Sequence, residues 1–251
     1  YTVVANAMNW RETPDAPWQP SVPEFVPVRG GWLAGRGQFQ VAVSSELFVA
    51  GAVSVVSPGG ATWQSTPMTL ALRDRSNGQV LVLGESRATQ GEQVAPDTIL
   101  FRDAFASEAG LRADVRLVVS AAAIECDVVV RNRLPLSVTL GADAAACDLV
   151  VLTEIFAGGP TAIREVARPV VGQAASLPDG QFATRADSVL ELSGLTMADG
   201  KVFGPDTDAL GRPRETVPAY RRYYQDGATQ RVFLEEAVPL DSLDQLMESL
   251  P

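Results

Sequence analysis

The pattern that most constrains this chain is a repeated one, in which short runs of alternating apolar and polar residues are separated by turn sequences from Gly37 to about Pro239. A period of two places apolar side chains on one face of a β-strand. Pro58-Gly59-Gly60 stops one apolar run, and Asn77-Gly78 lies between two others, which is the strongest short hairpin signal. Regularly spaced short strands favour an antiparallel sandwich over alternating strands and helices. We expect an all-β fold with one large β-sandwich or two small ones.

A short helix is expected at the end of the chain. Leu243, Leu246, Met247 and Leu250 recur at helical spacings of three and four, and Asp241 stands where an N-cap belongs. The sandwich region is therefore assigned to residues 36–251, ending in this helix. Its expected strands lie at 39–43, 48–56, 68–72, 80–83, 99–101, 112–120, 124–131, 137–140, 149–155, 189–192 and 231–238.

Residues 1–35 differ from the rest and predict an extended, proline-rich arm that starts with a strand. The first ten residues are apolar on both faces of that strand, with Tyr1 and Val3 on one face and Val4, Met8 and Trp10 on the other. A strand of this kind is normally covered on both sides. Prolines then follow at positions 14, 17, 20, 23 and 27, a spacing that favours extended chain and forbids helix.

The N-terminal strand has two possible partners. It can leave its subunit and add to the sheet of a neighbouring copy, or it can fold back as a strand of its own sheet. Donation to a neighbour is head-to-tail and does not close, so it builds filaments. The assembly strand of this hypothesis is marked by Tyr1, Val3, Val4, Met8 and Trp10, and its partners are copies of the same chain.

The composition excludes several classes of function. The chain has no histidine, so it lacks the usual general base and the commonest metal ligand, and histidine-dependent triads and metal sites are excluded. We expect no catalytic residue, cofactor or metal. The formal net charge is −10 and the arginines form no basic run, which argues against nucleic acid or an anionic membrane as a partner. Every apolar stretch is strand-sized, so membrane insertion is not expected.

The two cysteines, Cys126 and Cys147, lie 21 positions apart, which suits neither a CxxC redox pair nor a zinc knuckle. In an exported protein they could form one disulfide between neighbouring strands. The alternative is that both are buried thiols that pack as small apolar side chains.

Three groups of short motifs follow one another along the chain. They are Thr62-Trp63-Gln64-Ser65-Thr66-Pro67 with Gly78-Gln79-Val80-Leu81-Val82-Leu83-Gly84; Ala113-Asp114-Val115-Arg116 with Ile124-Glu125-Cys126-Asp127-Val128-Val129-Val130-Arg131 and Leu152-Thr153-Glu154; and Gly200-Lys201-Val202-Phe203 with Val217-Pro218-Ala219-Tyr220-Arg221-Arg222-Tyr223, Arg231-Val232-Phe233-Leu234-Glu235-Glu236 and Leu250-Pro251.

In this order and spacing, the motifs resemble a β-rich module of large bacterial cell-surface proteins, often ones that carry RHS-type repeats. The resemblance covers roughly residues 60–251 and implies a β-rich domain, an extracellular or cell-surface location and a structural or interaction role. It carries over no catalytic residue. The chain opens with Tyr1 rather than methionine, which fits removal of a leader or excision from a longer protein.

Three other groups of residues are candidates for catalysis or ligand binding. Glu125 and Asp127 share one face of a predicted strand, as a glycosidase pair would, but a solvated strand face is the favoured explanation. The loop at Asp206, Asp208 and Gly211 resembles a calcium loop but lacks the further ligands. An aromatic glycan-binding platform is the remaining candidate, with cross-strand packing as its alternative. Its residues are Trp63, Tyr220, Tyr223 and Tyr224.

Taken together, these patterns predict an extracellular structural or adhesive protein, a subunit of a surface assembly or filament joined through its N-terminal strand. A carbohydrate-binding module that recognises surface glycans is the first alternative, and a carboxylate-based glycosidase is the second.

Overall fold

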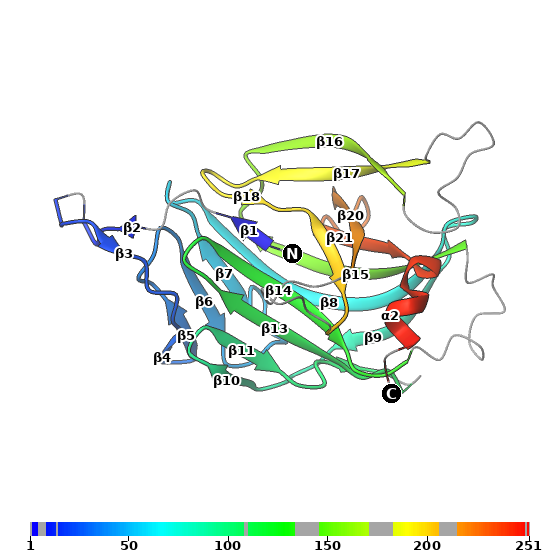
Figure 1. The fold of residues 1–251 in the computed structure, drawn as a ribbon, viewed down its shortest axis with the longest axis horizontal. Helices are drawn as coiled ribbons and strands as arrows, with labels where there is room; N and C mark the ends of the chain where they lie inside the picture. Colours follow the sequence, from blue (N-terminus) through cyan, green and yellow to red (C-terminus); the bar gives the residue numbers. More distant parts are fainter. Residues whose placement is uncertain are drawn as a thin grey trace.

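The computed structural model describes residues 2–4, 9–13, 15–107, 110–133, 146–170, 183–205, 215–248 and 250. Two large antiparallel sheets pack face to face around one core, and a short helix lies near the end of the chain (Figure 1). The expected all-β, sandwich-like fold with a short C-terminal helix is therefore confirmed. Among the residues described, no helix is long and apolar enough to span a membrane.

The first sheet has eight strands in the order β10-β11-β13-β14-β1-β18-β17-β16. Its middle is the β13–β14 hairpin, in which seven residue pairs align, from Ala113 with Val130 to Val119 with Ile124. The strands are β1 (Thr2–Val4), β10 (Gly91–Ala95), β11 (Thr98–Phe101), β13 (Ala113–Val119), β14 (Ala123–Val130), β16 (Ala162–Pro169), β17 (Thr184–Glu191) and β18 (Thr196–Met197).

The second sheet has eleven strands, nine of them in the order β19-β20-β21-β15-β8-β7-β6-β5-β4, while β9 pairs with β8 and β12 pairs with β9. The strands are β4 (Val26–Val28), β5 (Gly31–Ala34), β6 (Gln40–Ser44), β7 (Val53–Val56), β8 (Thr62–Asp74), β9 (Val80–Ser86), β12 (Phe105–Ala106), β15 (Cys147–Ala157), β19 (Gly200–Phe203), β20 (Thr216–Gln225) and β21 (Val232–Pro239).

The centre of the second sheet is the pairing of β8 with β15, which runs from Cys147 opposite Asp74 to Ala157 opposite Gln64. The register shifts at two places, between Leu152 and Thr153 and between Ile155 and Ala157. Alternate residues of both strands enter the core, among them Leu70, Leu72 and Ile155. The remaining residues point to the opposite, outer face of the sheet.

The predicted turn at Asn77-Gly78 is present as the hairpin between β8 and β9. Gly78 has φ of +74°, in the left-handed region that glycine adopts readily. The Asp74 carboxylate accepts hydrogen bonds from the backbone N–H and hydroxyl of Ser76, which fixes the turn before the chain reverses.

The N-terminal segment divides into three parts. Residues 2–4 form β1 inside the eight-stranded sheet, and residues 26–34 form β4 and β5 of the eleven-stranded sheet. Between them, β2 (Asn9–Trp10) and β3 (Gln19–Pro20) form a small ribbon that projects from one end of the sandwich (Figure 1). Pro27 fits this arrangement because β4 is an edge strand, where a missing N–H disrupts no ladder.

The C-terminal helix begins as a 3₁₀ turn, η3 (Leu240–Leu243), and continues as α2 (Asp244–Glu248). Leu240 and Leu243 are buried, and Leu246 and Met247 pack against the core. The predicted apolar spacing therefore attaches the helix to the sandwich.

Gly158 closes the β8–β15 ladder in a conformation that a side chain would disrupt. Its φ is +76°, and a Cβ atom there would lie 1.8 Å from the Thr62 carbonyl oxygen. Gly60 has a similar φ of +81°, with nothing within 4 Å of its Cβ position. Gly60 therefore isolates the cost of the backbone conformation from the cost of the clash.

We predict that Gly158→Ala lowers the free energy of unfolding by about 2–4 kcal/mol, because the left-handed conformation and the clash both disfavour alanine. Gly60→Ala should cost about 1 kcal/mol, from the conformation alone. Denaturant unfolding of the two variants measures the difference. Equal losses would show that the β8–β15 ladder does not need a glycine at its end.

Candidate functional site: an arginine face on the outer side of the larger sheet

Arginines gather on the outer face of the eleven-stranded sheet, opposite the core. Four neighbouring strands supply Arg73 (β8), Asp148 (β15), Glu235 (β21) and Arg222 (β20), each at a position that alternates with core residues. Three further arginines reach the same face from other segments. We call the set of Arg73, Arg75, Arg185, Arg222 and Arg231, with the carboxylates of Asp148, Glu154 and Glu235, the arginine face.

Asp148 is the centre of this set and accepts hydrogen bonds from three arginines. Arg185 donates through both Nη atoms, at 3.0 and 2.9 Å, while Arg75 and Arg73 donate at 3.0 and 3.1 Å. Burial alone would raise the pKa of Asp148, but the hydrogen bonds and positive charges outweigh burial and lower it. Asp148 is therefore ionised at neutral pH, with its lone pairs directed at guanidinium groups.

Two glutamates complete the ionic network. Arg73 Nη1 donates to Glu235 Oε1 at 2.5 Å, and Arg222 Nη2 donates to Glu235 Oε2 at 2.9 Å. Arg231 binds both carboxylate oxygens of Glu154. Two-pronged contacts of this kind fix the geometry of the guanidinium as well as the charge.

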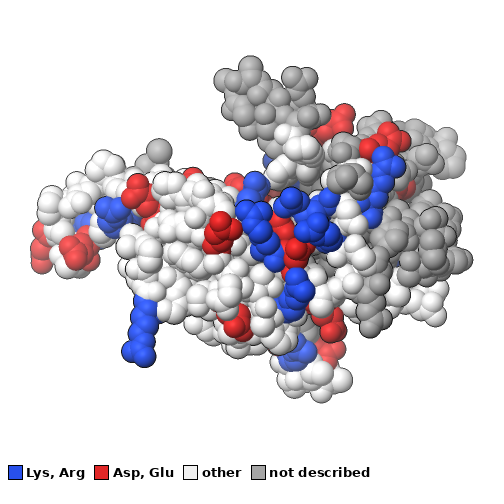
Figure 2. All heavy atoms as spheres, turned by 90° about the horizontal axis from the view of Figure 1, so that it is seen from below, with Lys and Arg blue, Asp and Glu red and all other residues white. Residues whose placement is uncertain are grey.

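The two signs of charge differ in exposure. The side chains of Asp148 and Glu235 are 0% and 7% exposed, whereas those of Arg75 and Arg222 are 31% and 59% exposed. Within this set, solvent therefore meets guanidinium groups more than carboxylates. Figure 2 shows one face of the molecule, on which basic and acidic side chains lie next to one another among uncharged ones.

Arg185 comes from β17, a strand of the other sheet, and its position depends on a second buried ion pair. Asp187, on the same face of β17, binds the guanidinium of Arg221 through Oδ1 at 3.2 Å and Oδ2 at 3.1 Å. Asp187 Oδ1 also accepts a hydrogen bond from the Arg221 backbone N–H at 2.8 Å. Arg221 lies in the part of β20 that does not pair with β19. The β16–β17 hairpin is thereby attached to the edge of β20, which places Arg185 over the outer face.

The structure separates the four predicted glycan-binding aromatics into two pairs. Trp63 is buried in the core, and its ring lies 6.3 Å from that of Tyr223. Tyr220 and Tyr224 lie on the opposite, outer face, where Arg185 and Arg222 stack over their rings at 4.9 and 4.5 Å. Tyr220 and Tyr224 therefore pack across strands with arginines over their rings, as the alternative explanation expected. The four aromatic side chains do not form one platform.

The N-terminal strand pairs on both of its sides within its own chain. Thr2, Val3 and Val4 align with Glu125, Ile124 and Ala123 of β14. Val3 and Val4 also align with Met197 and Thr196 of β18. Of the other residues of the predicted assembly strand, Trp10 belongs to the β2–β3 ribbon, and Tyr1 and Met8 lie outside the described residues.

The two cysteines are buried thiols in the structure, on different sheets: Cys126 on β14 and Cys147 on β15. The structure agrees with the second alternative from the sequence, that both cysteines are buried thiols, and it contains no disulfide between them. Burial raises the pKa of the Cys126 thiol to about 12, which makes it a poor nucleophile at neutral pH.

The carboxylate pair Glu125 and Asp127 lies on β14. Arg116 donates to Asp127 Oδ2 through Nε at 3.1 Å and Nη2 at 2.7 Å. Burial, followed by the charge of Asp127, raises the pKa of Glu125. Asp127 is thus engaged in an ion pair with a neighbouring strand. No group of acidic residues or cysteines suited to a metal ion occurs in the part of the chain that is described, and Asp206, Asp208 and Gly211 lie outside it.

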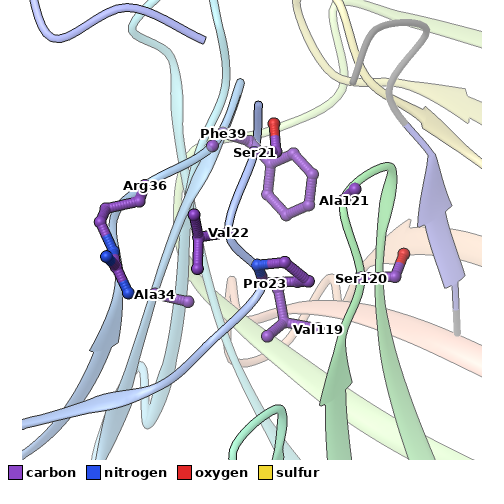
Figure 3. A pocket seen from close by; sticks show the side chains of 10 residues that line it. Ser21, Val22, Pro23, Ala34, Arg36, Phe39, Val119, Ser120 and Ala121 are labelled. Atoms are coloured by element: carbon purple, nitrogen blue, oxygen red, sulfur yellow. The ribbon is translucent and has the colours of Figure 1, made fainter. Parts of the chain in front are cut away.

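A small hollow lies between the N-terminal segment and the β13–β14 turn (Figure 3). Figure 3 shows Pro23 and the Phe39 ring on the side of Val119, Ser120 and Ala121. The empty volume is about 220 Å³, part of it open to solvent, which is below the usual range for small-molecule sites. The charged group in its lining, Arg36, pairs with Glu24 at 2.9 Å. This hollow is therefore a weaker candidate than the arginine face.

No family model, no curated protein and no solved structure matches this chain.

We predict that Asp148→Asn lowers the free energy of unfolding by about 3–5 kcal/mol at pH 7, because it leaves three arginines around a neutral group. Asp127→Asn, at a partly exposed pair, should cost about 1 kcal/mol or less. The pKa of Asp148 is lower in the folded protein than its unfolded value of about 3.9. The stabilisation by the ionised carboxylate is therefore complete at a pH above the unfolded pKa, and it is lost as the pH falls through the folded-state pKa.

Denaturant unfolding of wild type and both variants between pH 7 and pH 3 measures this effect. The gap between wild type and Asp148→Asn should narrow below about pH 4 as the carboxylate protonates. A gap that stays constant across this range would contradict a charge-based role for Asp148.

Proposed function

We propose that this protein is a subunit of an extracellular structural or adhesive assembly whose copies join by β-strand addition through the N-terminal strand. The observation that carries the proposal is the place of β1 between β14 and β18, with ladder pairs on both sides. A strand from another copy can make the same backbone hydrogen bonds in the same register, so exchange between copies requires no new interface chemistry.

The lengths of these ladders support exchange. β1 aligns three residues with β14 and two with β18, far fewer than the ten pairs of β8 with β15. Replacing so short a strand breaks few hydrogen bonds at a time. The β2–β3 ribbon that follows β1 stands away from the sandwich (Figure 1), where it could run to a neighbouring copy.

The geometry of exchange determines the form of the assembly. The segment that leaves, β1, and the place it enters, between β14 and β18, are different surfaces of the subunit, so the contact is heterologous. Heterologous contacts that do not close into a ring continue as filaments. We therefore propose a filament or sheet of subunits as the functional form.

A disulfide trap tests where β1 pairs. Thr2 and Glu125 are directly opposite each other, and the Cα atoms of such partners lie about 4.5–5.5 Å apart, within the range of a disulfide. We predict that the Thr2→Cys, Glu125→Cys double variant, oxidised after assembly, gives a ladder of covalent multimers on a non-reducing gel. The neighbouring Cys126 thiol should not compete, because its pKa is about 12.

The matched control is Arg116→Cys with Asp127→Cys, an opposing pair inside the β13–β14 hairpin that must close within one chain. It should give monomers under the same oxidation. If the Thr2–Glu125 variant also closes entirely within single chains at all protein concentrations, β1 is a permanent strand of its own subunit and strand exchange is wrong.

Deletion of residues 1–12 tests the role of the segment in assembly. We predict a chain that keeps its β-sheet circular dichroism spectrum but no longer forms filaments by negative-stain electron microscopy, since the donated strand is missing. Addition of a peptide with the sequence of residues 1–12 should bind the truncated chain without restoring filaments. Polymerisation of the truncated chain at the wild-type level would overturn the proposal.

A further inference from the structure

The arginine face carries more positive than negative charge, in a chain whose formal net charge is −10. Counting the members of the set defined above, five arginines face three carboxylates. In each ion pair the carboxylate is more buried than its arginine partner. The negative charges of the set are therefore less accessible to solvent than the positive ones. A local positive field on an acidic protein attracts anions to one place.

The arginines are also arranged to bind oxyanions. Arg185 and Arg222 lie over the rings of Tyr220 and Tyr224, at 4.9 and 4.5 Å from the ring centroids, and these contacts limit the movement of each guanidinium before a ligand arrives. A guanidinium has five N–H donors, and Arg222 directs one nitrogen, Nη2, at Glu235. Planar donors that are already oriented bind carboxylate or sulfate groups through two parallel hydrogen bonds.

The spacing of the face favours an extended ligand over a small one. Arg73 and Arg222 lie on strands separated by β15 and β21, and neighbouring strands are about 4.8 Å apart, so the two backbones are about 14 Å apart. Members of the arginine face line neither the hollow shown in Figure 3 nor a second hollow beside Trp63. A shallow row of donors on an open sheet suits a chain with repeated negative groups.

We propose that the arginine face binds acidic polysaccharide through the carboxylate or sulfate groups of its sugars. A neutral glycan is disfavoured because the rings of Tyr220 and Tyr224 are covered by arginines rather than free to stack on sugars. A single-stranded nucleic acid is disfavoured because its bases bind by stacking on free aromatic rings, and the rings of Tyr220 and Tyr224 are covered by arginines. The source of the ligand rests on the proposed extracellular function, while the binding chemistry rests on the face itself.

Two substitutions test the proposal without leaving a buried carboxylate alone. In Arg222→Gln, Glu235 keeps Arg73, and in Arg75→Gln, Asp148 keeps Arg73 and Arg185. The control is Arg102→Gln, which removes an exposed arginine paired with Glu92 outside the arginine face. All three variants should remain folded, which thermal unfolding checks.

Binding of the full chain to polygalacturonate and to heparin is measured by isothermal titration calorimetry, with dextran as the neutral polymer. We expect Arg222→Gln and Arg75→Gln to weaken binding to at least one acidic polymer about tenfold each, with Arg102→Gln unchanged. Rising salt should weaken the wild-type interaction. Tighter binding of polygalacturonate would show that the arginine face recognises sugar carboxylates. Tighter binding of heparin would show that it recognises sugar sulfates.

Three results would overturn the proposal: no binding of either acidic polymer, equal binding by wild type and both face variants, or tighter binding of single-stranded DNA than of the polysaccharides. Filament formation is scored separately on the same samples by electron microscopy. If the face variants still form filaments but no longer bind the polysaccharide, the binding site is separate from strand exchange. If the wild-type protein binds the polysaccharide but forms no filaments, the proposed assembly is wrong and the proposed binding site is unaffected.

Discussion

The ion pair between Asp187 and Arg221 holds the arrangement of the two sheets around β17. Both side chains are fully buried, and the pair joins β17 of the smaller sheet to β20 of the larger one. β17 aligns with β18 through a single residue pair, Glu191 with Thr196, so its own sheet holds the β16–β17 hairpin weakly. The buried pair and the Arg185–Asp148 contact attach the hairpin instead. The arginine face therefore depends on an interaction outside it.

Buried ion pairs of this kind specify an arrangement more than they stabilise it. Removing two charges from water costs nearly as much as their attraction returns, so a well-packed apolar pair could be equally stable. An apolar pair, however, would tolerate many positions of the hairpin, whereas Asp187 accepts bonds from both the side chain and the backbone N–H of Arg221. The geometry of these bonds sets the position of β17, and hence of Arg185. Specificity of placement is the role that the structure gives to its buried charges.

The sequence predicts local structure here much better than it predicts the site. β13 and β14 lie within one residue of the expected strands because their apolar alternation is unbroken. β16 was missed because Arg164, Glu165 and Arg168 interrupt any alternation. The arginine face was missed because its members are distant in the sequence and meet through strand order, which alternation does not encode. One signal was available: Asp148 and Glu154 are charged residues in a largely apolar strand, and buried charges require partners.

Edge strands limit how copies of this chain can join. Simple edge-to-edge pairing is opposed at β4 by Pro27, which has no N–H, and at β16 by Arg164 and Glu165, which place charges along the exposed strand. β1 differs, because it lies inside a sheet and its removal opens the ladders of both β14 and β18. A strand from another copy that enters there satisfies two sets of backbone groups at once. The two protected edges, β4 and β16, together with one replaceable inner strand favour assembly by exchange over side-by-side contact at those edges.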